Sequence, residues 1–113
     1  MRIVTAAIPM AVLRGMAEES FGDFVKAVVD VERGLMAVGG DMHSDEEAEL
    51  LDDGSRQENL WGINLYPDQE GDAFVEFDSV INLRPSQGNR SRSVDNAEIR
   101  EAIRRVVAAL VTR

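Results

Sequence analysis

The sequence has no cysteine, and it contains one histidine, one tryptophan and one tyrosine among its 113 residues. Without cysteine, the chain can form neither disulfides nor thiolate metal sites, and nothing in it indicates an oxidising compartment. The apolar start of the chain, residues 1–16, is too short to span a bilayer and lacks the basic segment and apolar run of a signal peptide. These absences predict a cytoplasmic protein that does not insert into membranes.

Lysine is also scarce, because eleven of the twelve basic residues are arginine. The formal net charge is −9, and residues 41–80 carry thirteen acidic residues with one arginine, whereas residues 81–113 carry seven arginines with three acidic residues. An acidic chain is a poor general binder of nucleic acid, since attraction to phosphates requires clustered positive charge. The arginine-rich end could instead bind a small anion, or the acidic middle segment of a second copy in a homo-oligomer.

The pattern of apolar residues predicts a single α+β domain over residues 1–113, with elements in the order α-β-β-α-β-β-α. Helical spacing and capping signals predict helices over residues 9–20, 44–54 and 95–110, and the last has the most regular apolar stripe. Ser44 and Glu47 form a capping-box pattern at the start of the second helix. Alternating apolar residues predict strands over 24–31, 35–38, 60–66 and 74–84. We expect two hairpins in one antiparallel sheet, covered by helices on one face in a two-layer arrangement.

Three long segments resemble a known family. They are FGDFVKAVVDVERGLMAVGG (21–40), GGDMHSDEEAELLDDGSRQENLWGINLYP (39–67) and EFDSVINLRPSQGNRSR (76–92). In these segments, and in its last amphipathic helix, the chain resembles a family of short bacterial proteins catalogued only as a domain of unknown function. The resemblance implies a small single-domain bacterial protein, and it implies no activity, cofactor or catalytic residue.

The single histidine, His43, lies among carboxylates. Asp41, His43 and Asp45 are spaced so that they could bind a divalent metal, although the start of the second helix also explains the acidic residues there. No second histidine or cysteine supports a metal, so no cofactor is assigned. The alternative chemistry is a metal-assisted or acid–base hydrolase, in which His43 works with Asp41, Glu58 or Asp78.

The polar loop over residues 84–93 suggests anion binding. Arginine side chains and the free N–H groups at the start of the last helix could hold a small anion there. The polar residues before the third strand could complete such a surface. The expected ligand-binding residues are Arg84, Asn89, Arg90, Arg92, Gln57 and Asn59.

The predicted strand 74–84 places further polar side chains on one face of the sheet. Asp78, Asn82 and Arg84 should lie in line there, beside Asn64 on the neighbouring strand. They could form a polar pocket, or they could be the solvated face of an antiparallel sheet. The leading hypothesis is therefore a ligand- or partner-binding domain, with the hydrolase and a structural homo-oligomer as alternatives.

Overall fold

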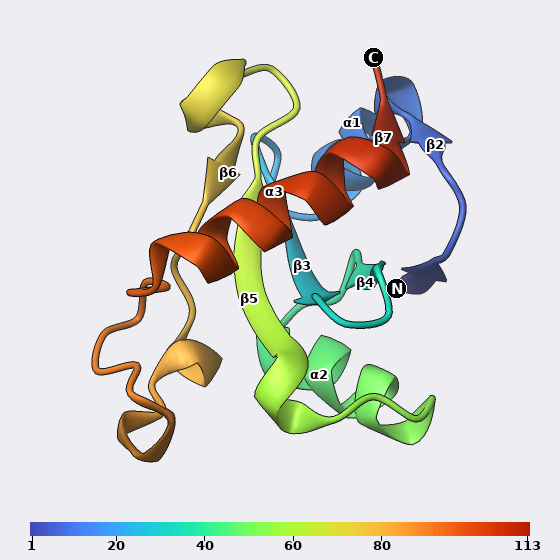
Figure 1. Cartoon of the computed structure of the whole chain (residues 1–113). Helices are drawn as coiled ribbons and strands as arrows, with labels where there is room; N and C mark the ends of the chain where they lie inside the picture. The colour runs from blue at the N-terminus through green and yellow to red at the C-terminus, as the bar shows by residue number, and fades with distance from the viewer.

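The computed structural model describes all 113 residues and shows an α+β fold built on a five-stranded antiparallel sheet (Figure 1). The strands, in their order across the sheet, are β1 (Arg2–Val4), β4 (Leu35–Val38), β3 (Val25–Asp30), β5 (Leu60–Leu65) and β6 (Val75–Glu76). Three helices accompany the sheet: α1 (Met10–Glu19), α2 (His43–Asp52) and α3 (Ala97–Leu110). Two short strands, β2 (Ile8–Pro9) and β7 (Val111–Thr112), pair in parallel outside the main sheet.

The hairpin of β3 and β4 forms the centre of the sheet, as the sequence predicts. Its last pair is Asp30 with Leu35, and the buried carboxylate of Asp30 accepts hydrogen bonds from the N–H groups of Glu32 and Arg33, both at 2.9 Å. Gly34 completes the turn with a φ of 69°, a conformation that residues with a Cβ rarely adopt. Local turn chemistry therefore fixes this hairpin.

Helices cover both faces of the sheet, so the predicted two-layer arrangement with helices on one face is wrong. Val29 faces the main core, which it shares with residues of α1 and α3. Val28, its neighbour on the strand, points to the opposite face and packs with Ala37, Leu60 and Leu50 of α2. All four residues of β4 are buried, and such continuous burial is what two covered faces require. Figure 1 shows α3 crossing in front of the strands.

The predicted strand 74–84 is also wrong beyond its first residues. Only Val75 and Glu76 pair with β5, and residues 80–82 form a 3-10 helix instead. Ser79 lies directly against Gly62 of β5, where an added Cβ would be 2.5 Å from the Ser79 Cβ. The glycine therefore allows the segment after β6 to approach the sheet without continuing it as a strand.

The helix starts differ from the predicted capping patterns. Met42 occupies the N-cap of α2 and makes no side-chain cap bond, so Ser44 lies inside the helix. At α3 the cap is Asn96, one residue after the expected start at Asp95, and its side chain accepts hydrogen bonds from the N–H groups of Glu98 and Ile99 at 2.8 and 3.1 Å. None of the three helices combines the length and apolar character needed to cross a membrane.

This difference between the helix starts gives a first prediction. Asn96→Ala should lower the free energy of unfolding by about 1 kcal/mol, because it removes a side-chain cap. Ser44→Ala should leave it nearly unchanged, since the Ser44 hydroxyl makes no cap bond. Urea denaturation of both variants measures the two values. Equal losses would show that the α3 cap contributes nothing beyond an ordinary surface side chain.

Candidate functional site

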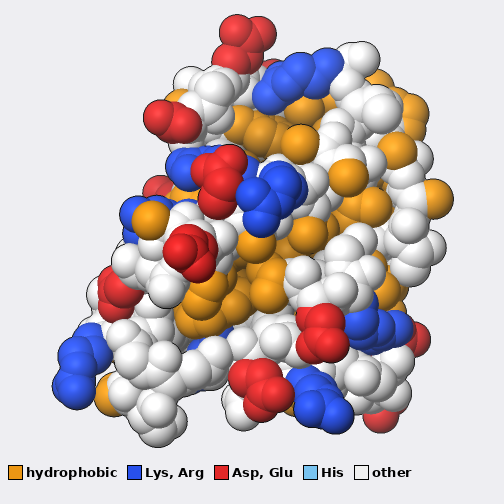
Figure 2. Space-filling model, in the orientation of Figure 1, with side chains coloured by type: hydrophobic (Ala, Val, Ile, Leu, Met, Phe, Trp, Pro, Cys, Tyr) orange, Lys and Arg blue, Asp and Glu red, His pale blue; other side chains and the backbone are white.

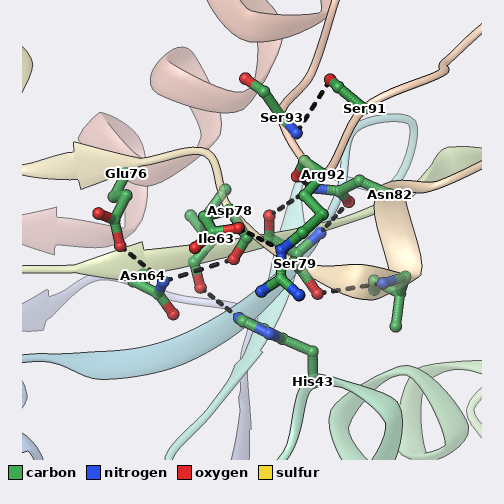
Figure 3. A network of polar contacts seen from close by, with 12 residues as sticks. His43, Ile63, Asn64, Glu76, Asp78, Ser79, Asn82, Ser91, Arg92 and Ser93 are labelled. Atoms are coloured by element: carbon green, nitrogen blue, oxygen red, sulfur yellow. Dashed lines mark hydrogen bonds and ion pairs between the residues drawn. The ribbon is translucent and has the colours of Figure 1, made fainter.

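Most of the side chains in residues 84–93 that were expected to bind a ligand instead bind the chain itself. Figure 3 shows part of this polar network, around Asn82. The side-chain amide of Asn82, just before the loop, faces the backbone of Gly62 and makes two hydrogen bonds to it, each 2.9 Å long. One is accepted from the Gly62 N–H and the other is donated to the Gly62 carbonyl. Asn82 thus replaces a strand neighbour at this edge of β5. It also donates to the carbonyl of Arg92 at 3.0 Å.

Asn89, an expected ligand-binding residue, is 3% exposed and holds the loop together. Its Nδ2 donates to the carbonyls of Asn82 and Ser93, both at 2.7 Å. Its Oδ1 accepts from the N–H of Asp95 at 2.8 Å. The amide has a partner on both ends within the chain, so its position is explained by folding of the loop.

Arg84 connects the loop to the start of β5 and the residues before it. Its guanidinium lies 4.1 Å from the centre of the Trp61 ring, and it donates to the carbonyls of Gln57 at 2.6 Å and Leu60 at 2.5 Å. Partial burial lowers the pKa of Arg84. Gln57 therefore takes part through its backbone, while the side chain of Asn59 donates to Glu32 at 2.6 Å.

The other two loop arginines differ in whether their guanidinium groups have a partner within the chain. Arg92 is paired with Asp78, with 2.7 Å between Nε and Oδ1. Arg90 is exposed and forms no ion pair or side-chain hydrogen bond within the chain. Of the residues expected to bind an anion, the structure thus leaves the guanidinium of Arg90 without a partner in the chain. The arginines of the loop do not surround one common binding site in the structure.

His43 begins α2 and points into the protein. It is 8% exposed, and its Nε2 donates to the carbonyl of Ile63 at 2.7 Å, so this nitrogen carries a proton. Burial lowers the pKa of His43. No hydrogen bond joins it to Asp41, Glu58 or Asp78, the carboxylates expected to work with it. The hydrolase site expected from the sequence is therefore not assembled.

The expected metal ligands are not brought together either. Asp41 and Asp45 line a surface hollow from which His43 is absent, and Glu58 lies exposed on a short 3-10 helix (Gln57–Asn59), 3.9 Å from Arg56. No group of three or more histidine, cysteine, aspartate or glutamate side chains is placed to hold a metal ion. The weak metal candidates Asp41, His43 and Asp45 thus diverge, because α2 turns His43 inward and its neighbours outward.

Glu46 lies in the first turn of α2, where the sequence predicts ordinary carboxylates that interact with the helix dipole. It is completely buried, and its Oε2 accepts a hydrogen bond from the N–H of Gly40 at 3.0 Å, whereas Oε1 has no partner. Burial raises the pKa of Glu46 to about 9, so the side chain is protonated at neutral pH. The sequence feature that could have indicated its burial is the helical spacing. Glu46 lies three residues after His43 and four before Leu50, on the inward face of α2.

The surface has five hollows, and two of them have opposite character. One, of about 620 Å³, is lined by Met1, Gly39, Gly40, Asp41, Asp45, Ala48, Glu49 and Asp52. None of its four carboxylates forms an ion pair, so this acidic hollow repels anions. The other, of about 460 Å³, lies between the C-terminal half of α3, β7 and the segment around β6.

This second hollow, the α3 pocket, has apolar walls and a charged rim. Its residues are Met10, Phe74, Val75, Val107, Ala108 and Val111, with Gly71, Asp72, Arg104 and Arg113. Figure 2 shows hydrophobic side chains at the surface of this region, between arginine side chains, over the C-terminal half of α3. A mostly apolar hollow with a few polar groups is the usual form of a small-molecule site.

The two rim arginines were not among the residues expected from the sequence. The guanidinium of Arg104 lies 5.0 Å from the centre of the Phe77 ring, and that of Arg113 lies 4.9 Å from the centre of the Phe74 ring. Arg104 is also 3.9 Å from Asp72. The signal that could have identified Arg104 is its position at the border of the apolar stripe of α3, next to Ile103.

No curated protein matches the chain, and no solved structure matches it either. A family model does match, and its match covers residues 2–110 of the 113. The family is described as "Protein of unknown function (DUF5674)", and this protein belongs to it.

Proposed function

We propose that this protein is a small-ligand-binding domain and that the α3 pocket is its binding site. The observation that carries the proposal is the combination of apolar walls and guanidinium groups around about 460 Å³ of open space. The volume is within the range of small-molecule sites, and buried apolar area together with a few oriented polar groups is how such sites obtain affinity and specificity. A cytoplasmic location remains part of this proposal.

Two alternatives from the sequence have less support. The hydrolase requires His43 to reach a carboxylate in a concave site, whereas its Nε2 is bound to a backbone carbonyl and it borders none of the hollows described above. Assembly of copies through the acidic middle segment and the arginine-rich end remains a separate proposal. Charge-driven assembly should weaken as salt rises, so light scattering at low and high salt tests it.

A pair of neighbouring substitutions tests the pocket. Ala108 lines the pocket, whereas Ala109, the next residue of α3, is exposed and outside it. Ala108→Phe should fill the space and weaken binding of the neutral fluorescent probe N-phenyl-1-naphthylamine at least about tenfold, because a bulky ring competes for the same apolar walls. Ala109→Phe should bind the probe like the unchanged protein.

The probe's fluorescence gives affinity and stoichiometry directly, and a melting curve confirms that both variants are folded. One probe per chain, lost in Ala108→Phe and kept in Ala109→Phe, supports the site. Absence of probe binding to the unchanged protein, or equal binding by the two variants, contradicts the proposal.

A further inference from the structure

The rim of the α3 pocket carries two cations whose charge is not neutralised by a close ion pair. Arg113 has no carboxylate partner within 4 Å, and Arg104 reaches Asp72 only at 3.9 Å. The side chain of Asp72 is 99% exposed, so water screens this contact. The arginine side chain of Arg104 is 34% exposed, which leaves it accessible from the pocket.

The two guanidinium groups are held by aromatic rings. Arg104 lies over Phe77 and Arg113 over Phe74, and Phe74 is itself a pocket wall. Stacking on a ring limits the side-chain conformations that a ligand would otherwise have to select. It also leaves the edge of each guanidinium, where its N–H donors lie, free for an acceptor. Such a donor edge fits a carboxylate, which can accept two parallel hydrogen bonds.

From this arrangement we infer that the α3 pocket binds an organic monocarboxylate with an apolar chain, the chain lying on Phe74, Val75 and Val107 and the carboxylate meeting Arg104 and Arg113. This inference rests on the proposed function of the same pocket. The apolar walls exclude a small hydrophilic anion as the preferred ligand, because it would leave them unfilled. Asp72 at the rim adds a like charge beside Arg104, and even when screened it repels a dianionic head group such as a phosphate monoester more than a monoanion.

The test compares ligands that share one chain and differ in the head group. Octanoate, 1-octanol, octylamine and octyl phosphate are titrated by calorimetry against the folded protein at pH 7.5. We expect octanoate to bind at least about tenfold more tightly than 1-octanol, because hydrogen bonds to charged groups are the stronger ones. Octylamine should bind more weakly still, and octyl phosphate should not exceed octanoate.

A double variant, Arg104→Gln with Arg113→Gln, should reduce octanoate binding to the level of 1-octanol and leave 1-octanol itself unchanged. Arg105→Gln is the matched control, since Arg105 is the next residue of α3, is exposed and lies outside the pocket. It should bind octanoate like the unchanged protein. The difference in affinity between octanoate and 1-octanol should also shrink as salt rises, because the rim charges are partly exposed.

The possible results test two things separately: which class of ligand the pocket binds, and whether the pocket is a binding site at all. Equal affinity for octanoate and 1-octanol, or preference for octylamine or octyl phosphate, overturns the carboxylate inference and leaves the pocket as a binding site. Equal losses in the double variant and in Arg105→Gln also overturn it, because the effect would then come from net charge. If the neutral probe does not bind, or binds equally to Ala108→Phe and Ala109→Phe, the proposed function itself fails.

Discussion

Glu46→Gln should stabilise the protein, and the gain should grow with pH. Below about pH 4.5 the carboxyl is protonated in both the folded and the unfolded chain, so it adds no pH dependence. Between the unfolded pKa near 4.5 and the folded pKa of about 9, the folded protein keeps the proton that the unfolded chain has released. The unfolded state therefore binds fewer protons, and the free energy of unfolding falls by about 1.4 kcal/mol for each pH unit.

Glutamine removes this cost because it is neutral at every pH. Its Oε1 can accept the hydrogen bond from Gly40, and its Nε2 takes the place of the oxygen that has no partner in the protein. At pH 7, about 2.5 units above the unfolded pKa, the expected gain is about 3 kcal/mol, which is large beside the total stability of a small domain. At pH 5 the gain should be below about 1 kcal/mol.

Urea denaturation at pH 5, 6, 7 and 8 measures this difference. Glu49→Gln is the control, because Glu49 lies on the same helix and its side chain is exposed, at the edge of the acidic hollow. It should change stability little, because its side chain is exposed and makes no hydrogen bond or ion pair in the chain. Parallel stability curves for Glu46→Gln and the unchanged protein would show that the carboxyl of Glu46 is not held protonated in the fold.

Asn82→Ala should be the most damaging single substitution in the loop network. It removes both side-chain hydrogen bonds to Gly62 and the bond to the carbonyl of Arg92. The N–H and carbonyl of Gly62 are buried and would lose their partners, and each unpaired buried group costs about 1–3 kcal/mol. The expected loss in the free energy of unfolding is therefore about 3 kcal/mol or more.

Amide hydrogen exchange gives a local reading of the same effect. The Gly62 N–H should exchange much faster in Asn82→Ala, whereas amides of the β3–β4 hairpin should change only as far as global stability falls. Asn59→Ala is the control, since it removes an exposed asparagine bond to Glu32 without uncovering buried backbone. A loss below about 1 kcal/mol in Asn82→Ala would mean that the loop finds other partners for Gly62.

The sequence predicted the parts of the fold that depend on neighbouring residues. The apolar spacing of α3 places Ile103, Val107 and Leu110 in the core, as the structure shows. The β3–β4 hairpin follows from its turn residues and its alternating pattern. Residues 77–84 are different: their alternating pattern predicts a strand, but the backbone turns away from the sheet, because Asn82 and Ser79 interact with Gly62, about twenty residues earlier in the chain.

At the candidate site too, the sequence predicted some features and only the tertiary structure decided the others. From the sequence alone, the arginines of the 84–93 loop and the carboxylates near His43 were the candidates, because their residue types suggest binding or catalysis. The tertiary structure gave Arg84, Asn89 and Arg92 partners within the chain and turned His43 toward Ile63. It placed Arg104 and Arg113 beside apolar walls that come from three separate parts of the chain.

By itself, the sequence determined the α+β class, the central hairpin, the position of α3 and the uneven distribution of charge, because each depends on composition or on residues a few positions apart. Only the tertiary structure decided that α2 covers the second face of the sheet, that Glu46 is buried and protonated, and which arginines border an open pocket. The physical reason is that burial, and with it the pKa of a carboxyl or the availability of a guanidinium, depends on segments that are distant in the chain and meet only in the folded protein.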